Sequence, residues 1–177
     1  MKKTVLVFGL ISGIIASSLM LGVVITARET ADFDNSMWMG YVSMVLSFVL
    51  IFAGIKNFRD KYNDGVISFG KAFRTGLYIA LIASTMYVVT WLVEYYLFFP
   101  NFMDKYAEHM MRSAQESGAS PAKLKDTAET VANFRNMYKN PILVVLLTYM
   151  EILPLGIAAT LISSLILKKK TPKVLNT

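Results

Sequence analysis

The sequence predicts an all-α, polytopic membrane protein: a bundle of four transmembrane helices with an extracytoplasmic helical hairpin between the third and fourth spans. Three observations predict this fold. Hydrophobic residues make up 55% of the 177 residues and gather in four long stretches. Basic residues are unequally shared between the two sides that these stretches define, and the pattern between the last two stretches becomes amphipathic. We expect one membrane domain over residues 1–177.

The four apolar stretches cover residues 4–26, 37–55, 75–99 and 141–167. An α-helix rises about 1.5 Å per residue, so each stretch can cross a hydrocarbon core about 30 Å thick. A soluble helix of this length needs a polar face, which these stretches largely lack, so membrane spans are favoured over buried core helices. The first stretch exceeds the apolar run of about 7–15 residues in a secretory signal, and we expect it to be retained.

The charges on the connecting segments predict the orientation. With the N-terminus inside, one side carries eleven Lys and Arg residues against two Asp residues, a net charge of +9. The other side carries seven basic and eight acidic residues, a net charge of −1. Short basic segments resist translocation, so the first side is predicted to be cytoplasmic and to hold both termini. Anionic lipid explains the basicity, and no nucleic-acid partner is expected.

Local signals predict how the spans are connected. A short acidic outer loop is expected over residues 27–36, with Asn35 or Ser36 as the cap of the second span. On the other side, Asn63-Asp64-Gly65 is typical of a tight turn, and Ser68 is placed to cap the helix that becomes the third span.

The segment over residues 101–139 predicts the outer hairpin. Apolar residues recur at steps of three and four in its first and second halves, which indicates two amphipathic helices. Between them, Gly118 suits a helix end, and Ser120-Pro121 suits a cap followed by a first-turn proline. Asn140-Pro141 repeats that signal at the start of the fourth span.

Small residues recur every four positions in three spans, which lets helices approach closely. They are Gly9, Gly13 and Ser17; Gly76, Ala80 and Ser84; and Gly156, Thr160 and Ser164. Packing within the bundle is the favoured interpretation, and self-association into a homo-oligomer is the alternative.

Only two residues place a charge inside the predicted spans, Glu94 and Glu151. Glu94 lies 20 residues beyond Arg74 and Glu151 lies 17 residues before Lys168, which places them about 30 Å and 25 Å above the inner face. Both therefore fall in one layer at the outer leaflet. A carboxylate within a membrane is costly, so each is a candidate functional residue.

Two interpretations of this layer stay open. In the structural one, each glutamate bonds to a Tyr or Thr hydroxyl, or pairs with Arg28, Arg135 or Lys139, and orients the hairpin. In the functional one, the two form a ligand or proton site under the hairpin. The candidate residues of that site are Glu94, Glu151, Trp91, Tyr95, Tyr149 and Pro154. Pro154 is also expected to kink the fourth span.

Composition and motifs argue against catalysis and cofactor chemistry. The chain has no Cys and one His, so thiol chemistry and a metal site are not expected. No nucleophile elbow, phosphate-binding glycine loop or paired-Asp motif occurs. We expect a non-enzymatic protein without a cofactor.

Several segments together resemble a family of uncharacterised bacterial membrane proteins, domain of unknown function 4199. They are Ser68 to Phe73, Glu94-Tyr95-Tyr96, Phe102 to Met111, Met137 to Pro141 and Glu151-Ile152-Leu153-Pro154. The resemblance covers nearly the whole chain and implies a four-span protein of bacterial envelopes, without an assigned activity or catalytic residues. We expect this protein in the bacterial inner membrane.

Two functions are carried forward. The first is binding of a membrane or periplasmic partner protein, a lipid or a small ligand at the outer face. The alternative is a small transporter or proton-coupled channel that uses Glu94 and Glu151.

Overall fold

The computed structural model describes the backbone of residues 1–30 and 33–169 and the side chains of residues 1–26 and 38–169. This part of the chain is helical and contains no named strand. Its elements are α1 (Lys2–Thr30), α2 (Phe33–Tyr62), α3 (Phe69–Val93), the π-helical turn η1 (Glu94–Phe98), α4 (Phe102–Glu116), α5 (Pro121–Tyr138) and α6 (Pro141–Leu167).

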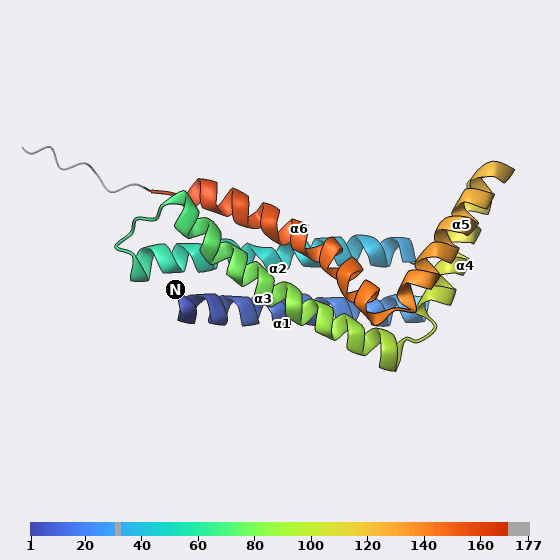
Figure 1. Cartoon of the computed structure of the whole chain (residues 1–177), viewed down its shortest axis with the longest axis horizontal. Helices are drawn as coiled ribbons and strands as arrows, with labels where there is room; N and C mark the ends of the chain where they lie inside the picture. The colour runs from blue at the N-terminus through green and yellow to red at the C-terminus, as the bar shows by residue number, and fades with distance from the viewer. Residues whose placement is uncertain (31–32, 170–177) are drawn as a thin grey trace, which may run out of the picture.

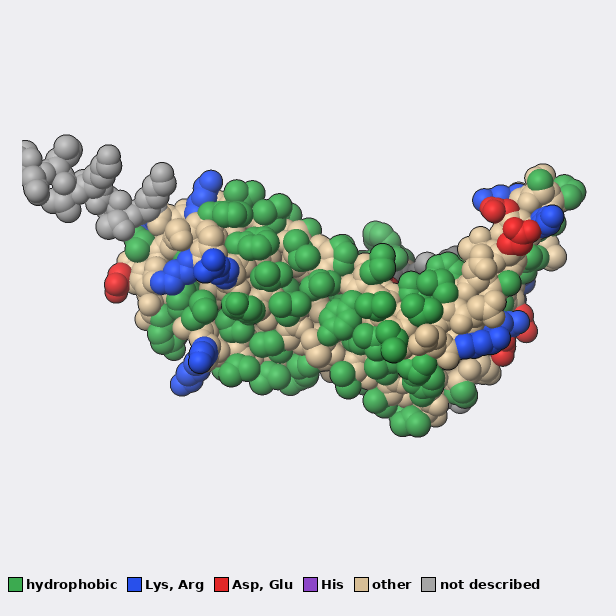
Figure 2. Space-filling view, viewed as in Figure 1, with side chains coloured by type: hydrophobic (Ala, Val, Ile, Leu, Met, Phe, Trp, Pro, Cys, Tyr) green, Lys and Arg blue, Asp and Glu red, His purple; other side chains and the backbone are tan. Residues whose placement is uncertain are grey.

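Four helices are long and apolar enough to cross a membrane, over Lys2–Thr26, Trp38–Tyr62, Phe69–Phe98 and Pro141–Leu167. They run side by side along the molecule (Figure 1), and apolar side chains cover most of its middle (Figure 2). Large apolar residues such as Ile14, Val45 and Leu161 face outward, as contact with lipid requires. The all-α prediction is confirmed, and so is the prediction of four helices long and apolar enough to cross a membrane.

The first two helices are longer than the spans predicted for them. α1 continues to Thr30 and α2 begins at Phe33, so a loop over the whole of residues 27–36 is wrong. Hydropathy marks only the part of a helix that lies in hydrocarbon, whereas the helix itself can continue into the polar layer. The backbone places Asn35 and Ser36 inside α2, and their side chains lie outside the described residues.

The other predicted turns and caps are present. Asp64 and Gly65 have φ values of 52° and 72° in the turn after α2, and the Lys71 amide donates to Ser68 Oγ at 3.4 Å. Ser120 Oγ accepts from the Lys123 amide at 3.3 Å at the start of α5. Asn140 Oδ1 accepts from the Ile142 amide at 2.9 Å at the start of α6.

The predicted small residues lie where helices meet inside the bundle. A Cβ added to Gly9 of α1 would lie 2.9 Å from Ile82 Cβ of α3. A Cβ on Gly76 of α3 would lie 2.8 Å from Thr160 Cγ2 of α6. These approaches are too close for any side chain, so the small residues position α3 between α1 and α6.

Helices α4 and α5 lie beyond the end of the bundle that is opposite the N-terminus (Figure 1). They are joined by residues 117–120 and pack against each other. The Arg135 guanidinium of α5 pairs with the Asp104 carboxylate of α4. Gly118, with φ of 71°, ends α4 in the left-handed conformation that glycine adopts readily. This pair of helices borders the candidate site.

Candidate functional site

An aromatic cluster joins the α4–α5 pair to α3. The ring of Tyr95 lies 5.2 Å from that of Tyr138, and the ring of Trp91 lies 5.0 Å from that of Phe102 in an edge-to-face arrangement. The indole N–H of Trp91 also lies near the Tyr138 hydroxyl. Edge-to-face pairs favour one relative orientation of these helices, so the cluster orients the α4–α5 pair over the bundle.

A cavity of about 400 Å³ lies beside this cluster. Its walls come from all six helices: α1 and α2 on one side, α3 and α6 on the other, and α4 and α5 above. The described lining residues are Met20, Val23, Val24, Gly40, Tyr41, Ser43, Met44, Tyr87, Trp91, Phe99, Phe102, Met103, Tyr106, Phe134, Tyr138, Leu147, Thr148 and Glu151. The volume falls within the range of pockets that bind small molecules, about 300–1,000 Å³.

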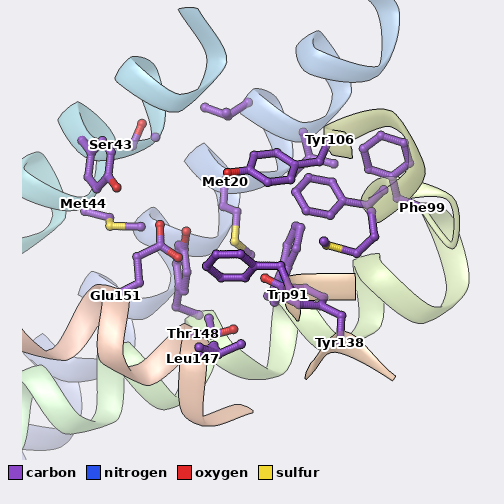
Figure 3. Close-up of a pocket in the computed structure, with 18 residues that line it drawn as sticks. Met20, Ser43, Met44, Trp91, Phe99, Tyr106, Tyr138, Leu147, Thr148 and Glu151 are labelled. Carbon is purple, nitrogen blue, oxygen red and sulfur yellow. The ribbon is translucent and has the colours of Figure 1, made fainter. Parts of the chain in front are cut away.

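The cavity has an enclosed part and a mouth. Met20, Met44, Trp91 and Phe99 are buried and form the enclosed part. Tyr41 is 46% exposed, Phe134 is 38% exposed and Glu151 is also exposed. Among the described lining residues, these three therefore border the mouth of the cavity. In Figure 3 the labelled side chains converge on one space from separate helices.

Tyr138 supplies a neutral polar group to the lining. Burial, and to a smaller extent the nearby Glu151 carboxylate, raises the pKa of its hydroxyl to about 12, and the neighbouring Trp91 indole N–H acts in the opposite direction. At neutral pH the hydroxyl is therefore protonated. It therefore has one proton to donate.

Glu151 is the one ionisable carboxyl group among the described lining residues. Its side chain extends from α6 toward the cavity (Figure 3). It makes no hydrogen bond or ion pair with any described residue. The two basic residues expected as partners are paired elsewhere: Arg135 with Asp104, and Lys139 with the Asn136 side-chain carbonyl at 3.2 Å. The Arg28 side chain lies outside the described residues.

Glu94 has a different environment. It begins η1, is 2% exposed, and neither of its carboxyl oxygens has a hydrogen-bond partner in the described part of the chain. It does not line the cavity. The layer predicted from the sequence thus contains one carboxylate that faces a cavity and one that the protein encloses.

Of the four remaining candidate residues, one lines the cavity and three do not. Trp91 lines the cavity, whereas Tyr95 lies behind it in the aromatic cluster. The Tyr149 hydroxyl lies 2.8 Å from the Thr85 hydroxyl of α3 and joins α6 to α3 outside the lining. Pro154 is exposed within α6, one turn beyond Met150. Tyr149 and Pro154 are therefore neighbours of the cavity wall and not part of it.

Comparison with known proteins adds one finding. The model of a family described as "Protein of unknown function (DUF4199)" matches residues 7–169. The chain belongs to this family. No curated protein and no solved structure matches it. The matched range of this DUF4199 chain includes every described residue that lines the cavity, from Met20 to Glu151.

Several lining residues of this DUF4199 protein were not predicted as site residues. Tyr87 lies one turn before Trp91 on the same face of α3, so helical spacing was a usable signal. Tyr138, Met103 and Tyr106 belong to the predicted apolar faces of the hairpin. Met20 and Met44 carry no signal that separates them from other apolar residues of their spans.

The lining offers little to a metal ion. No group of three His, Cys, Asp or Glu side chains suited to a metal occurs in the part of the chain that the structure describes. The cavity instead presents aromatic faces, methionine thioethers and one carboxylate, which suit an organic ligand better than an inorganic ion.

Proposed function

We propose that this protein is a non-enzymatic, multi-pass protein of the bacterial inner membrane that binds a small, largely apolar ligand in the cavity below the α4–α5 pair. One observation carries the proposal: a cavity of about 400 Å³ walled by all six helices. Cores are normally packed to the density of organic crystals. A cavity of this size with a polar group at its mouth is therefore typical of a binding site.

The same proposal includes the orientation. The α4–α5 pair is an extracytoplasmic helical hairpin, and the N-terminus, the α2–α3 turn and Lys169 are cytoplasmic. Basic side chains gather at the end of the molecule that holds the N-terminus (Figure 2), which supports this assignment under the positive-inside rule. The cavity then lies near the outer leaflet, where an amphipathic ligand concentrates.

A single-tryptophan protein provides the binding test. The chain has two tryptophans. Trp38 is exposed on α2, whereas Trp91 is 8% exposed and lines the cavity. In a Trp38→Phe background in lipid nanodiscs, 10-bromodecanol should quench Trp91 fluorescence saturably, because bromine quenches an indole that it contacts.

Two matched substitutions on α2 make this test specific. Ser43 lines the cavity, so Ser43→Phe fills part of it and should weaken binding by about tenfold or more. Val45 is 59% exposed and outside the lining, so Val45→Phe should leave binding unchanged. Equal quenching in both variants, or none that saturates in the parent protein, would contradict the proposal.

Proton-coupled transport is the second candidate, and one observation favours it. Glu94 is enclosed in the bundle with both carboxyl oxygens unpartnered among the described residues. A carboxyl group kept in such a place is costly to stability. Under this candidate, proteoliposomes should show a proton flux that requires Glu94.

A further inference from the structure

The carboxylate of Glu151 has no basic residue opposite it among the described residues that line the cavity. Among the described lining residues, Glu151 has the one carboxyl group, and none is Lys, Arg or His. The carboxylate has no hydrogen bond or ion pair with a described residue. A carboxylate at the mouth of an apolar cavity keeps only part of its hydration, so it favours a cationic partner.

Two hydroxyl groups of the lining, one on α6 and one on α2, make no hydrogen bond to this carboxylate. Thr148 Oγ1 donates to the Val144 carbonyl at 2.8 Å, and Ser43 Oγ donates to the Met39 carbonyl at 2.7 Å. Each hydroxyl has a single proton to donate. Both protons are directed to the backbone of their own helices, so neither is available to Glu151.

The aromatic lining has the same electrostatic preference as the carboxylate. Tyr87, Trp91 and Tyr138 line the cavity together with Phe102 and Tyr106. The face of an aromatic ring carries the negative part of its quadrupole and attracts cations, most strongly for Trp. Apolar surface from Met20, Met44 and Leu147 completes the lining and suits a hydrocarbon body.

We propose that the ligand of this cavity is a small amphipathic organic cation, with its ammonium group beside Glu151 and its apolar body among the methionines and aromatic rings. This inference rests on the proposed binding function and adds the chemical class of the ligand. An alkali or divalent ion is a poorer match, because it requires several oxygen ligands. An anionic amphiphile would meet the Glu151 carboxylate and the negative faces of the rings.

Three probes with one bromodecyl chain test the charge preference. They are (10-bromodecyl)trimethylammonium, 10-bromodecanol and 10-bromodecanoate, and each is titrated into the Trp38→Phe protein in nanodiscs with Trp91 quenching as the readout. Affinities are corrected for partition into protein-free nanodiscs. The ammonium probe should bind at least about tenfold more tightly than the alcohol, and the carboxylate probe more weakly than the alcohol.

Substitutions at Glu151 assign the preference to that residue. Glu151→Gln keeps the shape and should bring the ammonium affinity to within about twofold of the alcohol affinity. Glu151→Asp keeps the charge and should retain the preference. Glu116→Gln removes an exposed carboxylate from the end of α4 and is the matched control, with no expected change.

The outcomes separate this inference from the function on which it rests. If the alcohol binds and Ser43→Phe weakens it, but the ammonium probe has no advantage, the cation proposal is overturned and the ligand site stands. If the ammonium probe keeps its full advantage in Glu151→Gln, the placement of the ammonium group beside Glu151 is overturned. If no probe quenches Trp91 saturably, both proposals are overturned.

Discussion

Two glutamates that look alike in the sequence occupy different environments in the fold. Each is an acidic residue in an apolar helix, and each lacks a hydrogen-bond or ion-pair partner among the described residues. Glu151 faces a cavity that can hold a counter-charge, whereas Glu94 is 2% exposed and sealed in protein. They are therefore expected to respond differently to neutralisation.

Replacing Glu94 by Met should stabilise the protein. The change keeps the side-chain length and removes the cost of enclosing a carboxyl group without a partner, which is about 1–3 kcal/mol for a buried polar group. We expect the midpoint temperature of thermal unfolding, followed by loss of the monodisperse peak in size-exclusion chromatography, to rise by a few degrees.

The control for this prediction is Glu116→Met, at an exposed position of α4 where neutralisation should leave the midpoint unchanged. A lower midpoint in Glu94→Met would mean that the carboxyl group is stabilised in the fold after all. Loss of proton flux in the stabilised variant would favour the transport candidate.

At the scale of single residues, the sequence predicted what the bilayer makes costly. Glu94 and Glu151 were identified because charge in hydrocarbon has a high cost, and Trp91 because the helical rise places it at a similar height to them. Met20 and Met44 were not identifiable, since an apolar residue facing a cavity and one facing lipid follow the same pattern in a membrane helix.

At the scale of elements, local chemistry predicted where most helices begin. Ser68, Ser120 and Asn140 each accept a backbone amide at a helix start, because the first amides of a helix lack partners within it. The π-helical turn η1 was not predicted. It follows Val93 and precedes Phe99-Pro100, where the proline restricts the chain and ends the helix.

The prediction at the scale of elements concerns the contact between α1 and α3. It compares substitutions at two glycines of α1. A Cβ on Gly9 would lie 2.9 Å from Ile82 Cβ, which is fixed to the α3 backbone, so Gly9→Ala should separate α1 from α3. We expect a loss of about 1–3 kcal/mol. Gly22 has no atom within 4 Å of an added Cβ, so Gly22→Ala should be neutral or slightly stabilising.

The measurement is the same thermal unfolding experiment in lipid nanodiscs. Equal midpoints for the two alanine variants would show that α1 and α3 adjust to the added methyl group, and that the small-residue pattern of α1 is not required for packing inside the bundle. Self-association would then be the remaining explanation of the small-residue pattern.

At the scale of the whole molecule, the distribution of charge predicts the topology. The chain contains no cysteine, so one introduced cysteine is a unique label site. In intact spheroplasts, a membrane-impermeant maleimide should label Glu116→Cys at the end of α4. Lys61→Cys near the α2–α3 turn should be labelled only after the membrane is opened. The reverse pattern would contradict the proposed orientation.

The sequence alone determined the helical class, the four spans and many of the caps, because hydropathy over about 20 residues and the unpaired amides of a helix start are local properties. Only the tertiary structure decided that Glu151 faces a cavity while Glu94 is enclosed, and that the cavity exists. A cavity is the volume left between side chains of all six helices. That volume depends on how the close contacts at Gly9 and Gly76 and the Tyr95–Tyr138 ring contact orient whole helices, and no local pattern specifies such contacts between distant residues.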